Sequence, residues 1–436
     1  MTSPEAVRSF PTAVARTTPP ARTLWLGAAL VGLAAAFLWA PVGVLCVLGA
    51  ASCAWLVDRR ARVSVLLVVG GKTVLALFAT VAASAYFADG LLPGQVDQVF
   101  YTETARSIAR SILTERTLSV DYSSSVDIHN RSYNVVLGWA TALGRAGGFG
   151  GASAADLLGY RMLNVLFSTL LVVVALRLTT TLYAGAPNLR TYQALTVWGV
   201  GFMPYLTIYS QMVTRDVMIA LLFTTFIYGL VARKLVLAVI AVGVMYFTRL
   251  QFGIILSVAV LGWLLLSVIV RRHRNILWGG VALAALGTGG YVATFVLPSI
   301  AFVRSAVSPG QLAGFAAAFP VGILGLDVLF ASQGDLALSR STLLATRLIT
   351  PETILLPIFS ILGMILSKDN LYLKFSIMTY FIIVSYMLGY YISYGSVFLR
   401  LISPYYPAML IMSLPIFMAR ERSRPRAALS LGACAQ

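Results

Sequence analysis

The chain has 436 residues, of which 59% are hydrophobic and only 11% charged, with a mean hydropathy of +0.87 and a formal net charge of +17. A soluble domain carries about a quarter charged residues, so we expect most of this chain to lie in lipid. The basic residues gather in short clusters between apolar runs, at 58–62, 232–234, 271–274 and 420–426. This positive-inside pattern indicates contact with anionic lipid headgroups and argues against nucleic acid as a partner.

Apolar runs predict an all-α, polytopic integral membrane protein with about 12 transmembrane helices, since about 20 apolar residues cross a bilayer. When the runs alternate from an inside start, the basic clusters fall on the cytoplasmic side and both termini are cytoplasmic. Lys72 is then close enough to the cytoplasmic end of its run to extend its ammonium group to the surface. The runs lie at 23–39, 41–57, 64–87, 157–180, 190–209, 215–232, 235–248, 252–270, 276–297, 353–366, 371–394 and 401–419.

The segments outside these runs indicate how the chain is organised. No signal peptide is predicted, because the first residues lack a short apolar core and a cleavage pattern. The expected division is 1–22, a disordered cytoplasmic tail; 23–63, two extra N-terminal transmembrane helices; 64–420, a transmembrane catalytic core with external loops at 88–156 and 298–352; and 421–436, a second cytoplasmic tail.

The first external loop contains two predicted surface helices. In "VDQVFYTETARSIARSILTERTL", apolar residues recur at helical spacing opposite charged ones, namely Val99, Ile108, Ile112 and Leu113. This pattern is typical of an amphipathic helix lying on a membrane surface. The stretch "SYNVVLGWATALG" is too short to cross a bilayer and predicts a second surface helix.

Charged residues converge on the predicted external face. Asp97 follows the third run, Asp216 lies at the junction of the fifth and sixth, and Arg249 and Arg400 lie at later external junctions. Such a set suits glycosyl transfer from a lipid-phosphate sugar. A carboxylate accepts the proton of the attacking hydroxyl, and arginines stabilise the charge that develops on the departing phosphate.

Motifs in this order also occur in a known group of membrane enzymes. The stretches are "VDQVFYTETARSIA", "LGYRMLNVLFSTLLVVVALRL", "GFMPYLTIYSQMVTRDVMIALLF" and "FLRLISPYYPAMLI". Together they resemble the polytopic GT-C glycosyltransferases, which include protein O-mannosyltransferases, aminoarabinose transferases and mycobacterial arabinosyltransferases. The resemblance covers roughly 64–420. It extends to membrane polymerases of polysaccharide loci, which join lipid-linked repeat units.

The resemblance implies roles for particular residues. Asp97 would be the catalytic base and Asp216 the second acid. Arg400 would face the donor phosphate, with Arg249 nearby. The further expected substrate-binding residues are Tyr101, Arg161 and Arg215. Asp97 is followed by Gln98 and not by the acid that many family members carry, and two runs precede the usual first helix.

Each of these charged residues also has a structural reading. Asp97 could cap the surface helix, since Asp is a preferred N-cap residue. Asp216 and the arginines could be interfacial residues that anchor helix ends to headgroups. No spacing of His or Cys predicts a metal site. A carboxylate pair could hold a divalent metal ion, but no ligand spacing supports one.

The sequence thus predicts a glycosyltransferase of the bacterial cytoplasmic membrane. Its partners would be a polyprenyl-phosphate-linked sugar donor, a glycan or lipid-linked acceptor, and membrane lipids. One alternative is a polymerase or ligase of O-antigen or exopolysaccharide repeat units. Another is a flippase or transporter of lipid-linked sugars, although transporters favour charges near the bilayer midplane and internal repeats.

Overall fold

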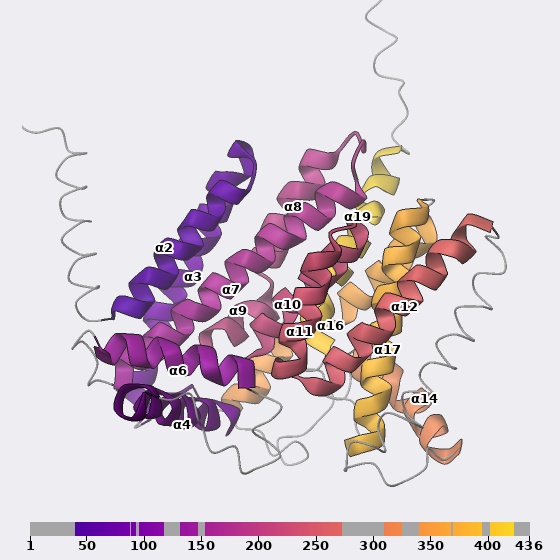
Figure 1. Cartoon of the computed structure of the whole chain (residues 1–436). Coiled ribbons are helices and arrows are strands. Elements are labelled where there is room, and N and C mark those ends of the chain that lie inside the picture. The colour runs from indigo at the N-terminus through magenta and orange to yellow at the C-terminus, as the bar shows by residue number, and fades with distance from the viewer. Residues whose placement is uncertain are drawn as a thin grey trace, which may run out of the picture.

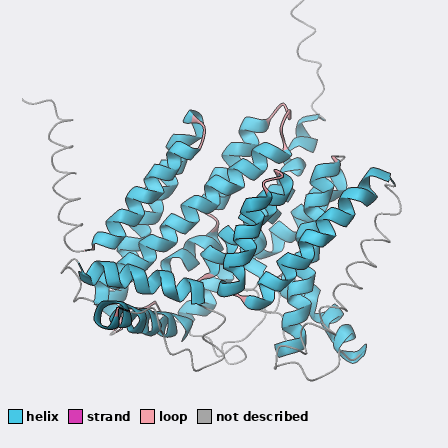
Figure 2. Ribbon diagram, in the orientation of Figure 1, coloured by secondary structure: helices cyan, strands magenta, loops and turns pink. Residues whose placement is uncertain are grey.

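The computed structural model describes residues 40–87, 89–92, 96–116, 131–146, 153–272, 309–324, 340–367, 369–394 and 402–422. Every regular element in these ranges is a helix and none is a strand (Figure 2). The all-α prediction is therefore confirmed for the described part of the chain. The predicted runs at 23–39 and 276–297 lie outside these residues, as do the tail 1–22 and the end of the chain beyond Arg422.

Most of the helices stand side by side as a tilted bundle (Figure 1). Two further helices, α4 (Val96–Arg110) and α6 (Arg131–Ala146), lie across the lower ends of α2, α3 and α7. Helix α14 (Pro309–Ile323) lies at the same lower end. The bundle contains α2 (Pro41–Cys53), α3 (Arg59–Tyr86), α7 (Ser153–Leu182), α8 (Leu189–Gly201), α9 (Pro204–Gln211), α10 (Asp216–Val231), α11 (Leu235–Thr248), α12 (Leu250–Arg272), α16 (Arg340–Leu366), α17 (Asn370–Tyr394) and α19 (Tyr406–Arg422), with short turns η1 (Ala54–Leu56), η2 (Ser111–Glu115) and η4 (Ser403–Tyr405).

Three helices in the described part are long and apolar enough to cross a membrane: Arg59–Tyr86, Ala154–Leu182 and Asn370–Tyr391. Shorter apolar helices accompany them, such as Asp216–Val231 and Leu235–Thr248. The outer face of α3 exposes large apolar side chains, namely Leu67, Val74, Phe78 and Val81. An apolar stripe of this kind is stable against lipid and costly against water, which agrees with membrane association.

The predicted run 190–209 is divided into two helices. Helix α8 ends at Gly201, Met203 is extended with φ −49° and ψ 117°, and α9 begins at Pro204. The proline ring disfavours helical geometry at the preceding residue, and proline suits the first position of a new helix. The break gives the chain a short, separately oriented helix just before Asp216.

The prediction that Lys72 reaches the membrane surface is wrong. Its side chain is fully buried, and Nζ donates a hydrogen bond to Oγ of Ser168 on α7. The reason is that α3 already begins at Arg59, so Lys72 lies about 20 Å along its axis. At that depth the neighbouring helix supplies the acceptor.

The two surface helices pack tightly against each other. A Cβ added to Gly138 of α6 would lie 2.3 Å from Cγ2 of Ile108 on α4, so only glycine allows this approach. The buried face of α4 contains Tyr101 and Ile108, whereas Val99 and Leu113 are exposed. Ile108 of the predicted apolar face is therefore buried against α6, and Val99 and Leu113 remain available for contact with lipid.

Candidate functional site

The candidate site is built around the segment that joins α9 to α10. Asp216 is the first residue of α10, and only 3% of its surface is exposed. A carboxylate in the first turn of a helix is stabilised by the backbone dipoles, which helps to hold the charge in a buried position. The preceding Thr214 closes a local turn, since its N–H donates to the carbonyl of Met212 at 2.9 Å.

Helix α7 holds this segment from one side. Arg161 donates from Nε to the carbonyl of Gln211 at 2.9 Å, and Asn164 donates from Nδ2 to the carbonyl of Met212 at 2.8 Å. The second oxygen within reach of the Asn164 amide is the carbonyl of Thr214, at 3.4 Å. Residues three apart lie on one face of a helix, so Arg161 and Asn164 together hold the 211–214 segment that precedes Asp216.

Arg161 also binds two other segments. Nη1 donates to Oγ1 of Thr80 at 2.8 Å, and Nη2 donates to the carbonyl of Gly90 at 3.1 Å. The side chain is completely buried. All three guanidinium nitrogens therefore donate to protein oxygens. Arg161 holds the α9–α10 segment against α3 and α7.

Gln98 connects the surface helix α4 to the same segment. Its Oε1 accepts from the N–H of Val213 at 3.2 Å, while its Nε2 donates to the carbonyl of Leu92 at 2.8 Å. The amide can accept and donate at the same time, whereas an ionised carboxylate has no hydrogen to give. Gln98 thus has a structural role, and it brings Asp97, in the first turn of α4, to this end of the bundle.

Two tyrosines line the α4–α6 side. The rings of Tyr101 and Tyr133 meet edge to face with centroids 5.2 Å apart, and the Tyr133 hydroxyl donates to Oδ1 of Asn164 at 3.4 Å. Burial raises the pKa of Tyr133 well above its ordinary value, with smaller contributions from Tyr101 and Asp216. The Tyr133 hydroxyl consequently stays protonated and remains a donor.

Two arginines lie in the same region as Asp216. Arg215 donates from Nη1 to the carbonyl of Thr248 at 3.0 Å, and Arg249 places its guanidinium 5.1 Å from the ring centroid of Tyr386. Tyr101, Asp216, Arg249 and Tyr386 all lie within electrostatic range of Arg215. The cluster therefore combines two cations with one buried carboxylate. The cations attract an anionic ligand, and the carboxylate can accept a proton from a group bound next to that ligand.

The structure brings together most of the residues predicted from the sequence. Tyr101, Arg215, Asp216 and Arg249 form one cluster, and Asp97 lies one helical turn before Tyr101. Arg161 lies behind the α9–α10 segment. Arg400 lies outside the described residues.

Several residues that build the site had no role predicted for them from the sequence. Gln98, Tyr133, Asn164 and Tyr386 all contact or face the cluster. A signal existed for Asn164, since an amide three residues after Arg161 in an otherwise apolar helix has to find a partner. Among the residues that the structure describes, no group of three His, Cys, Asp or Glu side chains could hold a metal ion.

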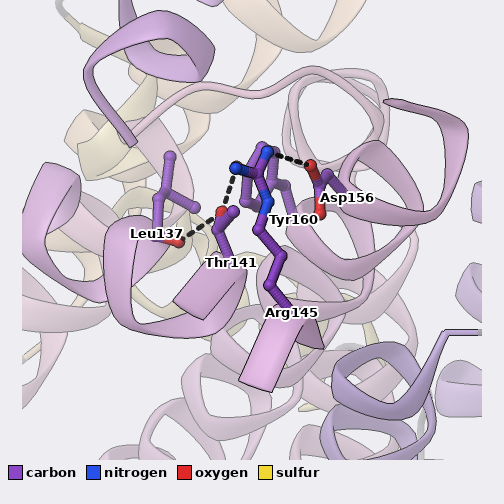
Figure 3. Close-up of polar contacts among 5 residues, drawn as sticks. All are labelled: Leu137, Thr141, Arg145, Asp156 and Tyr160. Carbon is purple, nitrogen blue, oxygen red and sulfur yellow. Dashed lines mark hydrogen bonds and ion pairs between the residues drawn. The ribbon is translucent and has the colours of Figure 1, made fainter. Parts of the chain in front are cut away.

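A second polar group joins α6 to α7 (Figure 3). Arg145 forms an ion pair with Asp156, with Nη2 and Oδ2 3.3 Å apart, and the Thr141 and Tyr160 hydroxyls are hydrogen-bonded. A shallow hollow beside it, open to solvent, is lined mainly by small apolar residues. Arg145 lies roughly 18 Å along α6 from Tyr133. This group is therefore separate from the cluster around Asp216.

Comparison with protein-family models, with curated proteins and with solved structures found no match. The chemistry of the cluster itself therefore carries the functional inference.

Proposed function

We propose that the chain is an integral-membrane glycosyltransferase that moves a sugar from a polyprenyl-phosphate-linked donor to a glycan or cell-surface acceptor. The observation that supports the proposal most is that Arg215 and Arg249 lie in the same region as the buried Asp216. Arginine binds phosphate through parallel hydrogen bonds and keeps its charge in a buried position. A carboxylate next to that phosphate is suited to act on the acceptor hydroxyl.

In the proposed reaction the acceptor oxygen attacks the anomeric carbon and forms the new glycosidic bond. The bond between that carbon and the donor phosphate oxygen breaks, and the phosphate leaves with both electrons. The hydroxyl proton passes to a carboxylate, with Asp97 as base and Asp216 as second acid. Arg215 and Arg249 bind the departing phosphate, as Arg400 would, and Tyr101 lines the sugar side.

The proposed topology places this cluster on the external face of a bacterial cytoplasmic membrane, in a core of about 12 spans. Two features support the orientation. The surface helices α4 and α6 come from one predicted external loop and α14 from the other, and all three lie at the same end of the bundle (Figure 1). The cluster lies at that end too, since Ser132 at the start of α6 contacts Thr248 beside Arg215.

Transfer from a panel of radiolabelled polyprenyl-phosphate sugars tests the proposal in membranes at matched expression. We expect wild-type transfer from one donor class and its loss in Asp97→Asn and Asp216→Asn. Asp156→Asn is the matched control, because Asp156 pairs with Arg145 away from the cluster. Full activity in both cluster variants would refute the assignment of the site, and formation of a long polymer would identify the polymerase alternative.

One observation favours a transporter as the second candidate. Lys72 is fully buried well inside the bundle, and ionisable residues within a membrane often mark transport pathways. Movement of a fluorescent lipid-linked sugar across vesicles, without transfer from any donor, would favour this candidate. Loss of that movement in Lys72→Met would place the pathway between α3 and α7.

A further inference from the structure

Helix α9 receives its N-terminal cap from another part of the chain. Pro204, at its first position, has no N–H, so the N–H of Tyr205 is its first available donor. This N–H donates to Oε2 of Glu352, on α16, at 3.0 Å. Met203, at the N-cap position, provides no side-chain cap. The N-terminus of α9 is therefore capped by a carboxylate 147 residues away in sequence, whereas a local Ser or Asp usually provides the cap.

The environment of Glu352 is unusual for a cap. Its other oxygen, Oε1, is buried and has no hydrogen-bond partner among the described residues. The capped helix presents the stacked rings of Tyr205 and Tyr209, whose centroids are 4.1 Å apart. Burying a carboxylate with one unsatisfied oxygen is unfavourable. Stability alone therefore does not account for an acid here, whereas a directional contact to the α9 N-terminus does.

The opposite end of α9 leads directly to the candidate site. Arg161 binds the carbonyl of Gln211, the last residue of α9, and Asp216 begins the next helix. With eight residues, α9 is a strut about 12 Å long between Glu352 and this segment. A shift at the capped end moves the other end, because a short helix behaves as a rigid body.

The neighbour of Glu352 is tied to the second predicted external loop. Oγ1 of Thr353 donates to the carbonyl of Leu324 at 3.3 Å, just after the end of α14. Glu352 and Thr353 therefore join α14, α16 and α9 at one point.

We propose that Glu352 is a positioning residue, which fixes α9 and through it the 212–216 segment, so that the contact between α14 and α16 helps to set the position of Asp216. The proposal rests on the proposed function only in taking Asp216 as a reacting carboxylate. It predicts two measurable consequences, one in backbone protection and one in kinetics.

Amide hydrogen exchange of the full chain in lipid nanodiscs tests the mechanical part without any substrate. We expect Glu352→Ala to raise exchange in the 205–216 segment about tenfold, since the hydrogen bond that caps α9 is lost. Glu352→Gln should stay close to wild type, because its amide oxygen still accepts from Tyr205. Asp369→Ala is the matched control: Asp369 caps α17 by accepting from the N–H groups of Leu371 and Tyr372, far along the chain from this segment.

Unchanged exchange of 205–216 in Glu352→Ala, or an equal rise in Asp369→Ala, would overturn the proposal. Where donor transfer is measurable, Glu352→Ala should lower kcat about tenfold with little change in KM, and Glu352→Gln should restore it. A fully inactive Glu352→Gln with wild-type exchange would show that the acid itself takes part in the chemistry. Absence of transfer in the wild type would count against the proposed function and leave the exchange result to decide the role of Glu352.

Discussion

Replacing Arg161 with methionine removes a cation but keeps a similar volume of side chain. The substitution leaves three oxygens without their donor, the carbonyls of Gln211 and Gly90 and the hydroxyl of Thr80. Hydrogen bonds inside membrane proteins contribute about 0.6 kcal/mol on average, and a typical one in a soluble protein about 0.5–1.5 kcal/mol. Three such bonds give an expected loss of about 1.5–4.5 kcal/mol in the free energy of unfolding.

The assay is the unfolding free energy in nanodiscs, measured by steric trapping, with Arg145→Met as the matched control. The Arg145 side chain is 32% exposed and pairs with Asp156, so its loss should cost at most about 1 kcal/mol. Arg161→Met should also abolish donor transfer, because the carbonyl of Gln211 marks the approach to Asp216. A loss of stability in Arg161→Met no greater than that in Arg145→Met would refute the reasoning.

Other substitutions test neighbouring contacts. Gly138→Ala should destabilise the protein by about 1–3 kcal/mol through its clash with Ile108, whereas Gly144→Ala, whose new Cβ would meet Val42 at an ordinary 3.8 Å, should not; equal thermal midpoints would contradict the close approach. Lys72→Met should leave the thermal midpoint unchanged or raise it, since apolar replacements of buried charges are often neutral or stabilising, and a large drop would show that the ammonium is needed for folding. Asn164→Leu should reduce transfer about tenfold or more at normal expression, and unaltered kinetics would show that its bonds to the α9–α10 segment are dispensable.

Helix boundaries followed from the sequence where charged or polar residues interrupt apolar runs. The run predicted at 235–248 is the observed α11, and the run at 215–232 differs from α10 by one residue at each end. Arg249 and the pair Arg215–Asp216 end or begin these helices because charge is costly in lipid. The amphipathic pattern likewise gave the two surface helices, although it did not show which side of α4 would be covered by α6.

The contacts that build the site were not predictable in the same way. Gln98 and Val213 are 115 residues apart, and Lys72 and Ser168 are 96 apart. Periodicity describes one helix at a time and contains no information on which helix supplies a partner. The resemblance singled out Arg161, but its three bonds depend on how α3, α7 and α9 meet. The role of Glu352 could not be predicted from the sequence, because a single acid next to a proline is common at the ends of helices.

The central claim is that a lipid-linked phosphate binds between Arg215 and Arg249, beside Asp216. Photo-crosslinking with a diazirine-bearing polyprenyl-phosphate sugar, mapped by mass spectrometry in nanodiscs, tests this most directly. We predict labelling at the start of α10 and at the α11–α12 junction that unlabelled donor competes away and that Arg249→Gln weakens. Labelling that matches a neutral polyprenol probe, spread over the lipid-facing side of α3, would contradict the claim.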